Sequence, residues 1–340
     1  MNEPLVSVVI STYNEEKYIL EAIDSILTQS YSNMEIIIVD DASTDRTVEI
    51  IRGINDPRIR LYENSVNRKL AHNLNFAISV AQGDYIARMD ADDVSRKDRI
   101  KTQVSYMEKH QDIDILASFA KTFGDSSITK KSPSSHSDIH ATLLFTNPIC
   151  HPTVMFRKRT MDYRYDENCA AGQDYELWAR IVGSKKFHVL DRVLLNYRVI
   201  QRQRKAEYLQ KQKHSALKAR EYLYYQLFSR EEEECWKMFL SLIDMDFYDF
   251  HGKSQQDMEN LLKFADLMTA RNEKNGVFEK AAFTDALANV LFQQWYLSLF
   301  ATDVSVDVFM HSKFAGIIGK QDLLMQAKTW YKICKKKVSR

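Results

Sequence analysis

The chain has 340 residues, of which 45% are hydrophobic and 27% are charged. This composition is typical of a globular protein and excludes a collagen, a disulfide scaffold and a disordered tail. Because the length exceeds an ordinary domain of roughly 100–200 residues, we expect one large domain with an appendage. The 47 basic and 46 acidic side chains leave a net charge of +1, so no overall field attracts nucleic acid and any anion must be bound locally.

The four cysteines stand far apart and form no CxxC pair, so we interpret them as reduced thiols. No apolar run approaches the roughly 18 residues that span a bilayer, and the first residues lack the basic and apolar regions of a signal peptide. These features predict a cytoplasmic protein. They leave open a peripheral contact at the inner face of the plasma membrane.

Strands and helices alternate along the first third of the chain. A short β-branched run at 6–10, a buried-type run at 35–39 and segments at 59–62 and 85–89 predict strands, and helical spacing of apolar residues follows each of them. Ser43 or Thr44 is expected to cap the second helix. Because parallel strands need long crossovers, this alternation predicts an open α/β sheet with helices on both faces.

The order loosens after about residue 112. We expect strands at 115–123, 153–156 and 187–190, a helix through 175–182, and a surface loop over 129–137. Past about residue 202, glycine and proline nearly vanish and long helical patterns take over. We therefore expect a catalytic-type α/β domain at 1–204 and a helical region at 205–340 that contacts an acceptor, another subunit or a membrane.

Polar clusters follow three of the predicted strands. They are Thr12-Tyr13-Asn14-Glu15, Asp40-Asp41 and Asp90-Ala91-Asp92-Asp93. In an open α/β sheet, ligands bind at the carboxyl ends of the strands, so we expect the clusters to meet at one edge. The sequence has neither GxGxxG nor GxxxxGK[ST], so another group must neutralise phosphates.

Asp90 and Asp92 lie two apart on an extended segment, which lets both carboxylates hold a hard divalent cation, Mg²⁺ or Mn²⁺, against a diphosphate. Such an ion stabilises charge on a leaving pyrophosphate oxygen. Asp40 can accept the imide N–H of uracil, and Tyr13 offers a flat face for a base. The competing interpretations are that the acids only cap helices and that Tyr13 only packs.

Three segments together resemble the family 2 glycosyltransferases of the GT-A fold: VSVVISTYNE from Val6, EIIIVDDASTD from Glu35 and ARMDADD from Ala87. The resemblance covers about 4–197. It implies a nucleotide-sugar donor, most simply a UDP-sugar, and inversion of the anomeric centre in a single displacement. It also implies a glycan or lipid-linked acceptor in bacterial surface polysaccharide or glycoconjugate synthesis.

By this resemblance, the nucleoside contacts are Thr12, Tyr13, Glu15 and Asp40, while Asp90 contacts the ribose or sugar and Asp92 the metal. The segment GQDYELW from Gly172 matches the region of the family's catalytic base, which makes Asp174 the candidate base. Spacing alone favours a helix cap at Asp174. Relatives usually have Glu-Asp where this chain has Gln173-Asp174.

Four further positions carry alternatives. His151 resembles an acceptor-side residue, although a lone histidine is also commonly structural. Arg88 shares strand parity with Asp90 and contacts donor phosphate or pairs with an aspartate. Lys69 stands near a position where relatives tend to have glycine. One interpretation is that the lysine instead adds a contact to a donor phosphate. Ile200 occupies a position where relatives often carry a metal- or phosphate-binding histidine, so a third protein ligand to the metal stays open.

The last residues, 330–340, are basic with aromatic neighbours and suit either an anionic lipid surface or a solvated helix end. The helical region is also a candidate for the subunit contact of a homo-oligomer. Two functions compete with the transferase. A sugar-nucleotide-forming nucleotidyltransferase would need a glycine-rich loop where this chain has Thr-Tyr-Asn-Glu, and a nucleotide-binding pseudoenzyme or scaffold would keep the fold without chemistry.

Overall fold

The computed structural model describes residues 3–160, 162–200, 206–244, 253–301, 309 and 312–317. The chain divides into two compact units, Met1–Tyr222 and Leu223–Arg340. The division lies later in the chain than the expected one at 204/205, because most of helix α7 (Ala206–Tyr224) is grouped with the first unit.

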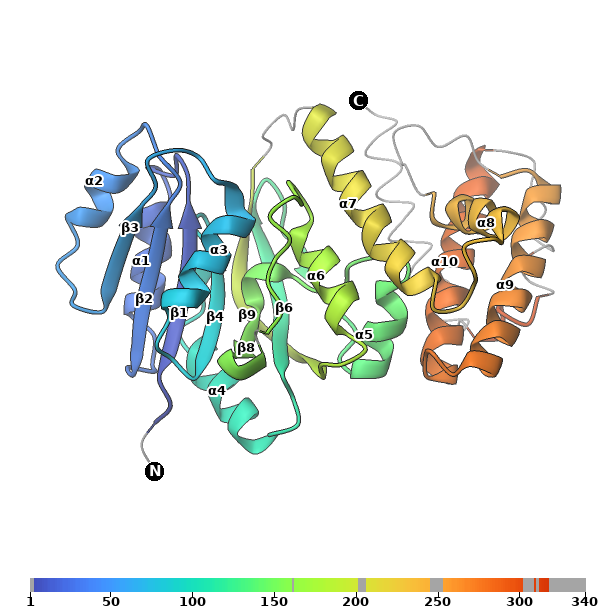
Figure 1. The fold of residues 1–340 in the computed structure, drawn as a ribbon, viewed down its shortest axis with the longest axis horizontal. Coiled ribbons are helices and arrows are strands. Elements are labelled where there is room, and N and C mark those ends of the chain that lie inside the picture. Colours follow the sequence, from blue (N-terminus) through green and yellow to red (C-terminus); the bar gives the residue numbers. More distant parts are fainter. Residues whose placement is uncertain are drawn as a thin grey trace. The chain divides into compact units, whose positions relative to one another are not determined.

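A nine-stranded sheet organises the described part of the first unit. Half of it is parallel, as the alternation of strands and helices predicts, with the order β3-β2-β1-β4. Figure 1 shows these strands side by side. The elements of this half are β1 (Val6–Thr12), α1 (Ile19–Leu27), β2 (Met34–Asp40), α2 (Thr47–Arg52), β3 (Ile59–Glu63), α3 (Lys69–Val80) and β4 (Tyr85–Asp90).

The other half of the sheet is mixed. Strand β8 (Met155–Arg157) runs antiparallel to both β4 and β6 (Ile115–Gly124), and β9 (Phe187–Val199) runs parallel to β6. Two short strands, β5 (Val94–Ser95) and β7 (Thr129–Lys130), pair antiparallel with β9 and β6. The helices of this half are α4 (Arg99–Lys109), α5 (His136–Leu143) and α6 (Gln173–Ile181), with 3₁₀ turns at His151–Thr153 and Lys158–Thr160.

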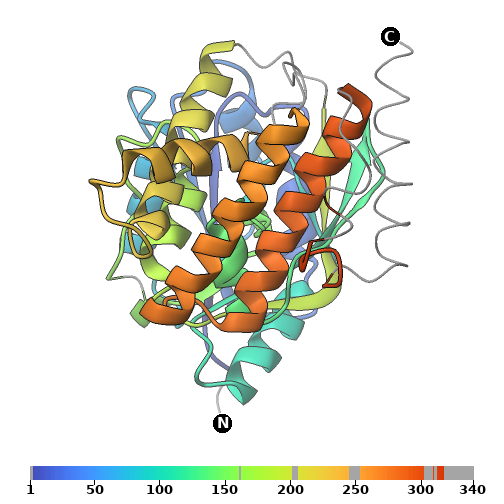
Figure 2. The same cartoon turned by 90° about the vertical axis from the view of Figure 1, so that its right-hand side faces the viewer.

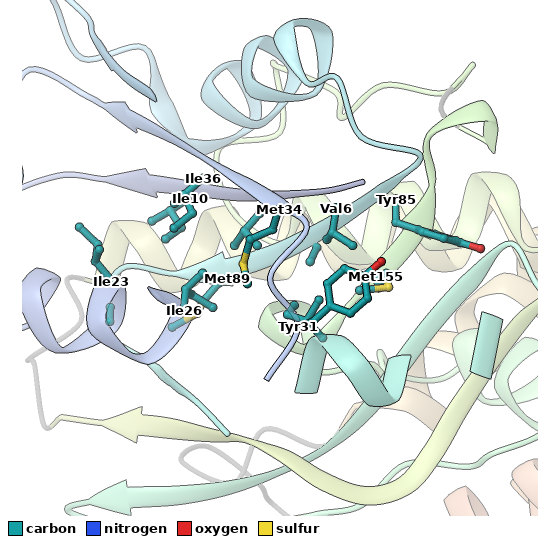
Figure 3. Packing of buried hydrophobic residues seen from close by; sticks show 14 of the residues in the cluster. Val6, Ile10, Ile23, Ile26, Tyr31, Met34, Ile36, Tyr85, Met89 and Met155 are labelled. Carbon is teal, nitrogen blue, oxygen red and sulfur yellow. The ribbon is translucent and has the colours of Figure 1, made fainter. Parts of the chain in front are cut away.

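One face of the parallel strands is covered by α1 and α4. Ile23 and Ile26 of α1 pack beside Ile10 and Met89, and all four side chains are completely buried (Figure 3). Burying each such side chain contributes about 1.5–3 kcal/mol, so this core holds the strand ends in fixed positions.

Helix α3 covers the opposite face, in front of the strands in Figure 1. Its Leu74 is buried, and its Asn73 donates a hydrogen bond of 3.0 Å to Ser11 Oγ on β1. The sheet therefore has helices on both faces. The predicted α/β architecture, with a helical C-terminal region, is confirmed.

Three local predictions differ from the structure. Neither Ser43 nor Thr44 caps α2, which begins after Arg46 without a side-chain cap. The expected loop over 129–137 contains β7 and the start of α5, whose N-cap Ser135 accepts from Asp138 N–H. Strand β9 extends well beyond 187–190, because it pairs along the whole of β6.

The second unit is helical, as predicted. Helices α8 (Glu233–Ile243), α9 (Gln255–Asn275) and α10 (Lys280–Ala301) pack together, and Figure 2 shows α9 and α10 side by side. Among the described residues, no helix combines the length and apolar content needed to cross a bilayer. The basic segment 330–340 and Cys334 lie outside the described residues, and the other three cysteines are free thiols.

Candidate active site

The polar clusters that follow β1, β2 and β4 lie at one edge of the sheet. In the strand register Thr12 is opposite Asp40, and Ser11 is opposite Asp90. Two strand spacings separate Asp40 from Asp90, which places their Cα atoms roughly 10 Å apart. The carboxyl ends of the parallel strands thus bring together groups that are far apart in the sequence.

Asp40 is almost fully buried and hydrogen-bonded to the start of its own loop. Its carboxylate accepts from Ser43 Oγ at 2.5 Å and from Ser43 N–H at 2.9 Å. The same hydroxyl oxygen accepts from Asn14 N–H at 2.9 Å, so Ser43 joins the loops after β1 and β2. A carboxylate has about four acceptor positions, so Asp40 retains capacity for a ligand N–H.

The loop after β1 presents its aromatic ring to solvent. Tyr13 is 47% exposed, and Asn14 adopts the left-handed conformation with φ of 54°. The backbone N–H of Glu15 donates to Thr47 Oγ1 at 2.8 Å. Thr12 Oγ1 is buried, and no described residue hydrogen-bonds to it. This loop therefore offers a flat ring and a hydroxyl next to Asp40.

Asp41, to which the sequence assigned no separate role, organises the start of α3. Its carboxylate accepts from the backbone N–H groups of Arg68 at 2.7 Å and Lys69 at 3.0 Å, and from Asn64 Nδ2 at 3.0 Å. Lys69 has φ of 72°, a left-handed conformation that favours glycine. This conformation would suit glycine better than a residue with a side chain, while the ammonium group of Lys69 is exposed.

Three carboxylates form a cluster after β4. One oxygen from each of Asp90, Asp92 and Asp93 lies within 4.8 Å of the others. Asp93 is fully buried, and burial together with the neighbouring Asp90 charge raises its pKa to about 8. Closely spaced carboxylate oxygens are suitable ligands for a hard divalent cation such as Mg²⁺ or Mn²⁺. The sequence identified Asp90 and Asp92 for this purpose and left Asp93 without a role.

Arg88 lies beneath the cluster and is 3% exposed. Its Nη2 contacts Asp90 Oδ1 at 2.5 Å, which is the pairing with aspartate that the sequence offered as one alternative. Burial opposes the charge of the guanidinium, but the carboxylate of Asp90 outweighs it and keeps the pKa of Arg88 raised. Its Nε and Nη1 are buried and have no hydrogen-bond partner among the described residues.

Asp174 is the second residue of α6. The N-cap is Gly172, with φ of 70° and no side-chain cap, so Asp174 does not occupy the capping position. Its carboxylate accepts from Asn147 Nδ2 at 2.8 Å. Burial raises the pKa of Asp174, whereas the Tyr175 backbone N–H, the charge of Arg88 and the Asn147 amide act in the opposite direction. Arg88 is thus close enough to act electrostatically on both Asp90 and Asp174.

His151 lies in the wall next to these groups and is 8% exposed. Its Nε2 is 2.8 Å from the Tyr165 hydroxyl, and its ring meets Trp178 edge-on at 6.0 Å between centroids. Burial, aided by the charge of Arg88, holds the pKa of His151 well below its usual value. The imidazole is therefore neutral at physiological pH. Ile200, directly after β9, offers no ligand atom to a metal.

Two pockets lie elsewhere on the first unit. One of about 600 Å³ is lined by Tyr163, Arg180, Lys218 and neighbouring residues. The other, of about 630 Å³, is lined by Tyr85, Arg157 and neighbouring residues at the amino end of the strands. Neither includes the carboxylates described above, so these two pockets are separate from the candidate site, which is identified by its charged groups.

Comparison with known proteins identifies the family of this chain. The model of glycosyl transferase family 2 matches residues 7–166. An uncharacterized glycosyltransferase of Haemophilus influenzae is 32% identical over 235 residues, covering 64% of this chain and 72% of the relative. An Escherichia coli protein named UDP-Glc:alpha-D-GlcNAc-diphosphoundecaprenol beta-1,3-glucosyltransferase WfaP is 32% identical over 182 residues, covering 52% of this chain and 70% of the relative.

Solved structures share the fold. The chain matches the S. aureus protein TarS with a TM-score of 0.56 and 18% identity, covering 85% of this chain and spanning about half (52%) of TarS. A shorter TarS structure, residues 1–349 in complex with UDP, matches with a TM-score of 0.54 and 18% identity, over 86% of this chain and 90% of the TarS chain. At this identity the likeness establishes the fold, and the mixed sheet with its flanking helices is of the GT-A type.

Proposed function

The chain belongs to glycosyltransferase family 2, and on that basis we propose that it transfers a sugar from a UDP-sugar to an acceptor hydroxyl with inversion at the anomeric carbon. The observation that supports this most is the arrangement of acidic groups around Arg88. Asp40 and the Asp90–Asp93 cluster lie at the carboxyl ends of neighbouring strands, and Arg88 interacts electrostatically both with Asp90 and with Asp174 on α6.

The donor half of the site lies between β1 and β2. In this proposal Asp40 accepts the uracil imide N–H, Tyr13 stacks on the base, and Thr12 and Glu15 bind ribose or base hydroxyl and amide groups. The unpartnered Thr12 hydroxyl and the exposed Tyr13 ring fit these tasks. Lys69 supplies a cation for the donor phosphates.

A divalent cation, Mn²⁺ or Mg²⁺, fits the cluster of Asp90, Asp92 and Asp93, because hard oxygen ligands lie within reach of a common point. When bound, such a cation offsets the negative charge of the leaving diphosphate. Asp92 and Asp90 are the proposed ligands. Arg88 pairs directly with Asp90, and in this proposal its two other guanidinium nitrogens, Nε and Nη1, are available to the donor phosphates.

Asp174 is the proposed general base. It takes the proton of the acceptor hydroxyl as that oxygen attacks the anomeric carbon, while the bond from this carbon to the diphosphate oxygen breaks on the opposite side. Asn147 orients the carboxylate by its hydrogen bond of 2.8 Å. His151, buried against Tyr165, shapes the acceptor side of the site.

The acceptor proposal rests on the relatives. The E. coli protein is named for a lipid-linked acceptor, and we propose a glycan or lipid-linked acceptor here, in surface polysaccharide or glycoconjugate synthesis. A peripheral membrane contact or a homo-oligomer built on the helical unit would bring such an acceptor to the site. Both remain proposals for the second unit.

A panel of UDP-, GDP- and dTDP-sugars, assayed for nucleotide release with Mn²⁺ and with EDTA, tests the function. We expect release from a UDP-sugar with Mn²⁺ only, and its loss in Asp92→Ala. Asp191→Ala, which removes an exposed carboxylate on β9, is the matched control and should retain activity. Calorimetric binding of UDP without any release would instead indicate a nucleotide-binding scaffold.

A further inference from the structure

Arg198, near the end of β9, is attached to the loop that carries the acidic cluster. Its Nε donates to the backbone carbonyl of Asp92 at 2.7 Å, and its own backbone N–H donates to Asp93 Oδ1 at 2.8 Å. A third contact joins its Nη2 to the Glu21 carboxylate on α1. One side chain thus connects the cluster to two other elements of the fold.

Two aromatic rings fix the guanidinium between them. Its central carbon lies 4.4 Å from the centroid of the Tyr18 ring and 4.3 Å from that of the Phe123 ring. The side chain is 13% exposed. Cation–π contacts of this kind contribute more as they become desolvated, so the guanidinium has little freedom to leave Asp92.

The loop between β4 and β5 has a reason to need such an anchor. Carboxyl groups whose oxygens lie within 4.8 Å of one another repel when they are ionised, and this repulsion favours opening of the loop in the absence of a cation. Strand β5 pairs with β9 through Val94 and Ser95, and Arg96 N–H donates to Leu194 of β9 at 3.0 Å. The Arg198 side chain adds a hydrogen bond to the backbone carbonyl of Asp92, inside the loop itself.

We propose that Arg198 is a positioning residue that holds the Asp90–Asp93 loop in the arrangement in which its carboxylates share one divalent cation. This inference rests on the proposed function, since it assumes that the cluster binds a metal. Arg198 does not touch the metal or the donor in this role. It acts through the backbone of Asp92, so its loss should weaken metal binding without removing a ligand.

The test measures Mn²⁺ binding directly, by electron paramagnetic resonance titration in the presence of UDP. Mutation of the outer-shell partners of metal ligands typically lowers metal affinity by about 10–100-fold. Because Arg198 contacts a backbone atom and not a ligand side chain, we expect Arg198→Ala to raise the Mn²⁺ dissociation constant by about ten-fold, at the low end of this range. Arg198→Lys keeps the charge without the planar fork, so its constant should fall between those of the wild type and Arg198→Ala. With Mn²⁺ at saturation, kcat should return to within about two-fold of the wild type.

Arg96→Ala is the matched control, because Arg96 is an exposed arginine next to β5 whose Nε reaches Asn196 at only 3.4 Å. It should bind Mn²⁺ as the wild type does. UDP affinity in EDTA should be equal in all variants. If Arg198→Ala does not fold, the Mn²⁺ dissociation constant of Arg198→Lys tests the proposal in its place.

The outcomes separate the two proposals. A wild-type protein that binds no Mn²⁺ in the presence of UDP would overturn the metal role of the cluster, and this inference with it. If the wild type binds Mn²⁺ and the dissociation constant of Arg198→Ala is unchanged, only the positioning role is overturned. The same holds for an unchanged constant in Arg198→Lys when that variant is the only one that folds.

Discussion

Replacing Asp174 by asparagine removes the proposed base while keeping its shape. Asn147 Nδ2 now donates to the carboxylate at 2.8 Å, and the carbonyl oxygen of an asparagine can accept the same hydrogen bond. The substitution therefore preserves the start of α6. What it removes is the ability to take a proton from the acceptor hydroxyl.

General-base catalysis contributes about 10²–10⁴-fold, which corresponds to about 2.7–5.4 kcal/mol in the activation free energy. We expect kcat to fall by that factor, with the dissociation constant for UDP unchanged. Because burial raises the pKa of Asp174 above its usual 3.8, keeping this carboxylate ionised at neutral pH opposes folding. The neutral amide should therefore leave the melting temperature unchanged or higher.

The assay is steady-state nucleotide release with Mn²⁺ and a saturating acceptor, alongside UDP titration and thermal unfolding. Asp138→Asn is the matched control, because Asp138 lies in the first turn of α5 and also bonds a neighbouring group, Ser135. It should keep wild-type kcat. If Asp174→Asn retains more than about a tenth of wild-type kcat, the assignment of the base is wrong.

Three further predictions address neighbouring groups. Asn147→Ala removes a hydrogen bond that lowers the pKa of Asp174, so the acid limb of the kcat–pH profile should move to higher pH. An unmoved limb would contradict the contact. Tyr13→Ala should weaken UDP binding by about 0.5–1.5 kcal/mol, whereas Tyr13→Phe should not, as measured by calorimetry. Lys69→Gly should raise the free energy of unfolding in urea by about 1 kcal/mol, because φ of 72° disfavours a side chain, and an unchanged or lower stability would refute this reason.

Local patterns were sufficient to predict the parallel half of the sheet. Each of its strands is a short, largely apolar run followed by a helix, and the right-handed crossover rule leaves few ways to arrange such units. The rule that ligands gather at the carboxyl ends of strands then placed the loops after Thr12, Asp40 and Asp90 at one edge. The roles assigned to these side chains stay predictions.

The missed features depend on contacts between distant segments. Asn147 meets Asp174 across 27 residues, and Arg198 meets Asp92 across 106. No periodicity or spacing encodes such pairs. The Ser43 cap failed for a related reason, because its hydroxyl bonds Asp40 of the preceding strand instead of the following helix. A capping residue placed before an apolar helical pattern does not show which of these two partners its hydroxyl will bond.

Arg88 is a buried charged group that is only partly paired. Burying a guanidinium is costly unless it is paired, and Asp90 satisfies only part of it. The large majority of buried side-chain polar atoms in proteins have partners, so the unpaired Nε and Nη1 require an explanation. Both nitrogens are buried, so under the proposed function the donor diphosphate would supply acceptors to them only after the residues that cover them move. Once in contact, a guanidinium already held by Asp90 would need little further reorientation as negative charge grows on the leaving group, which is the condition under which a fixed charge lowers a barrier most.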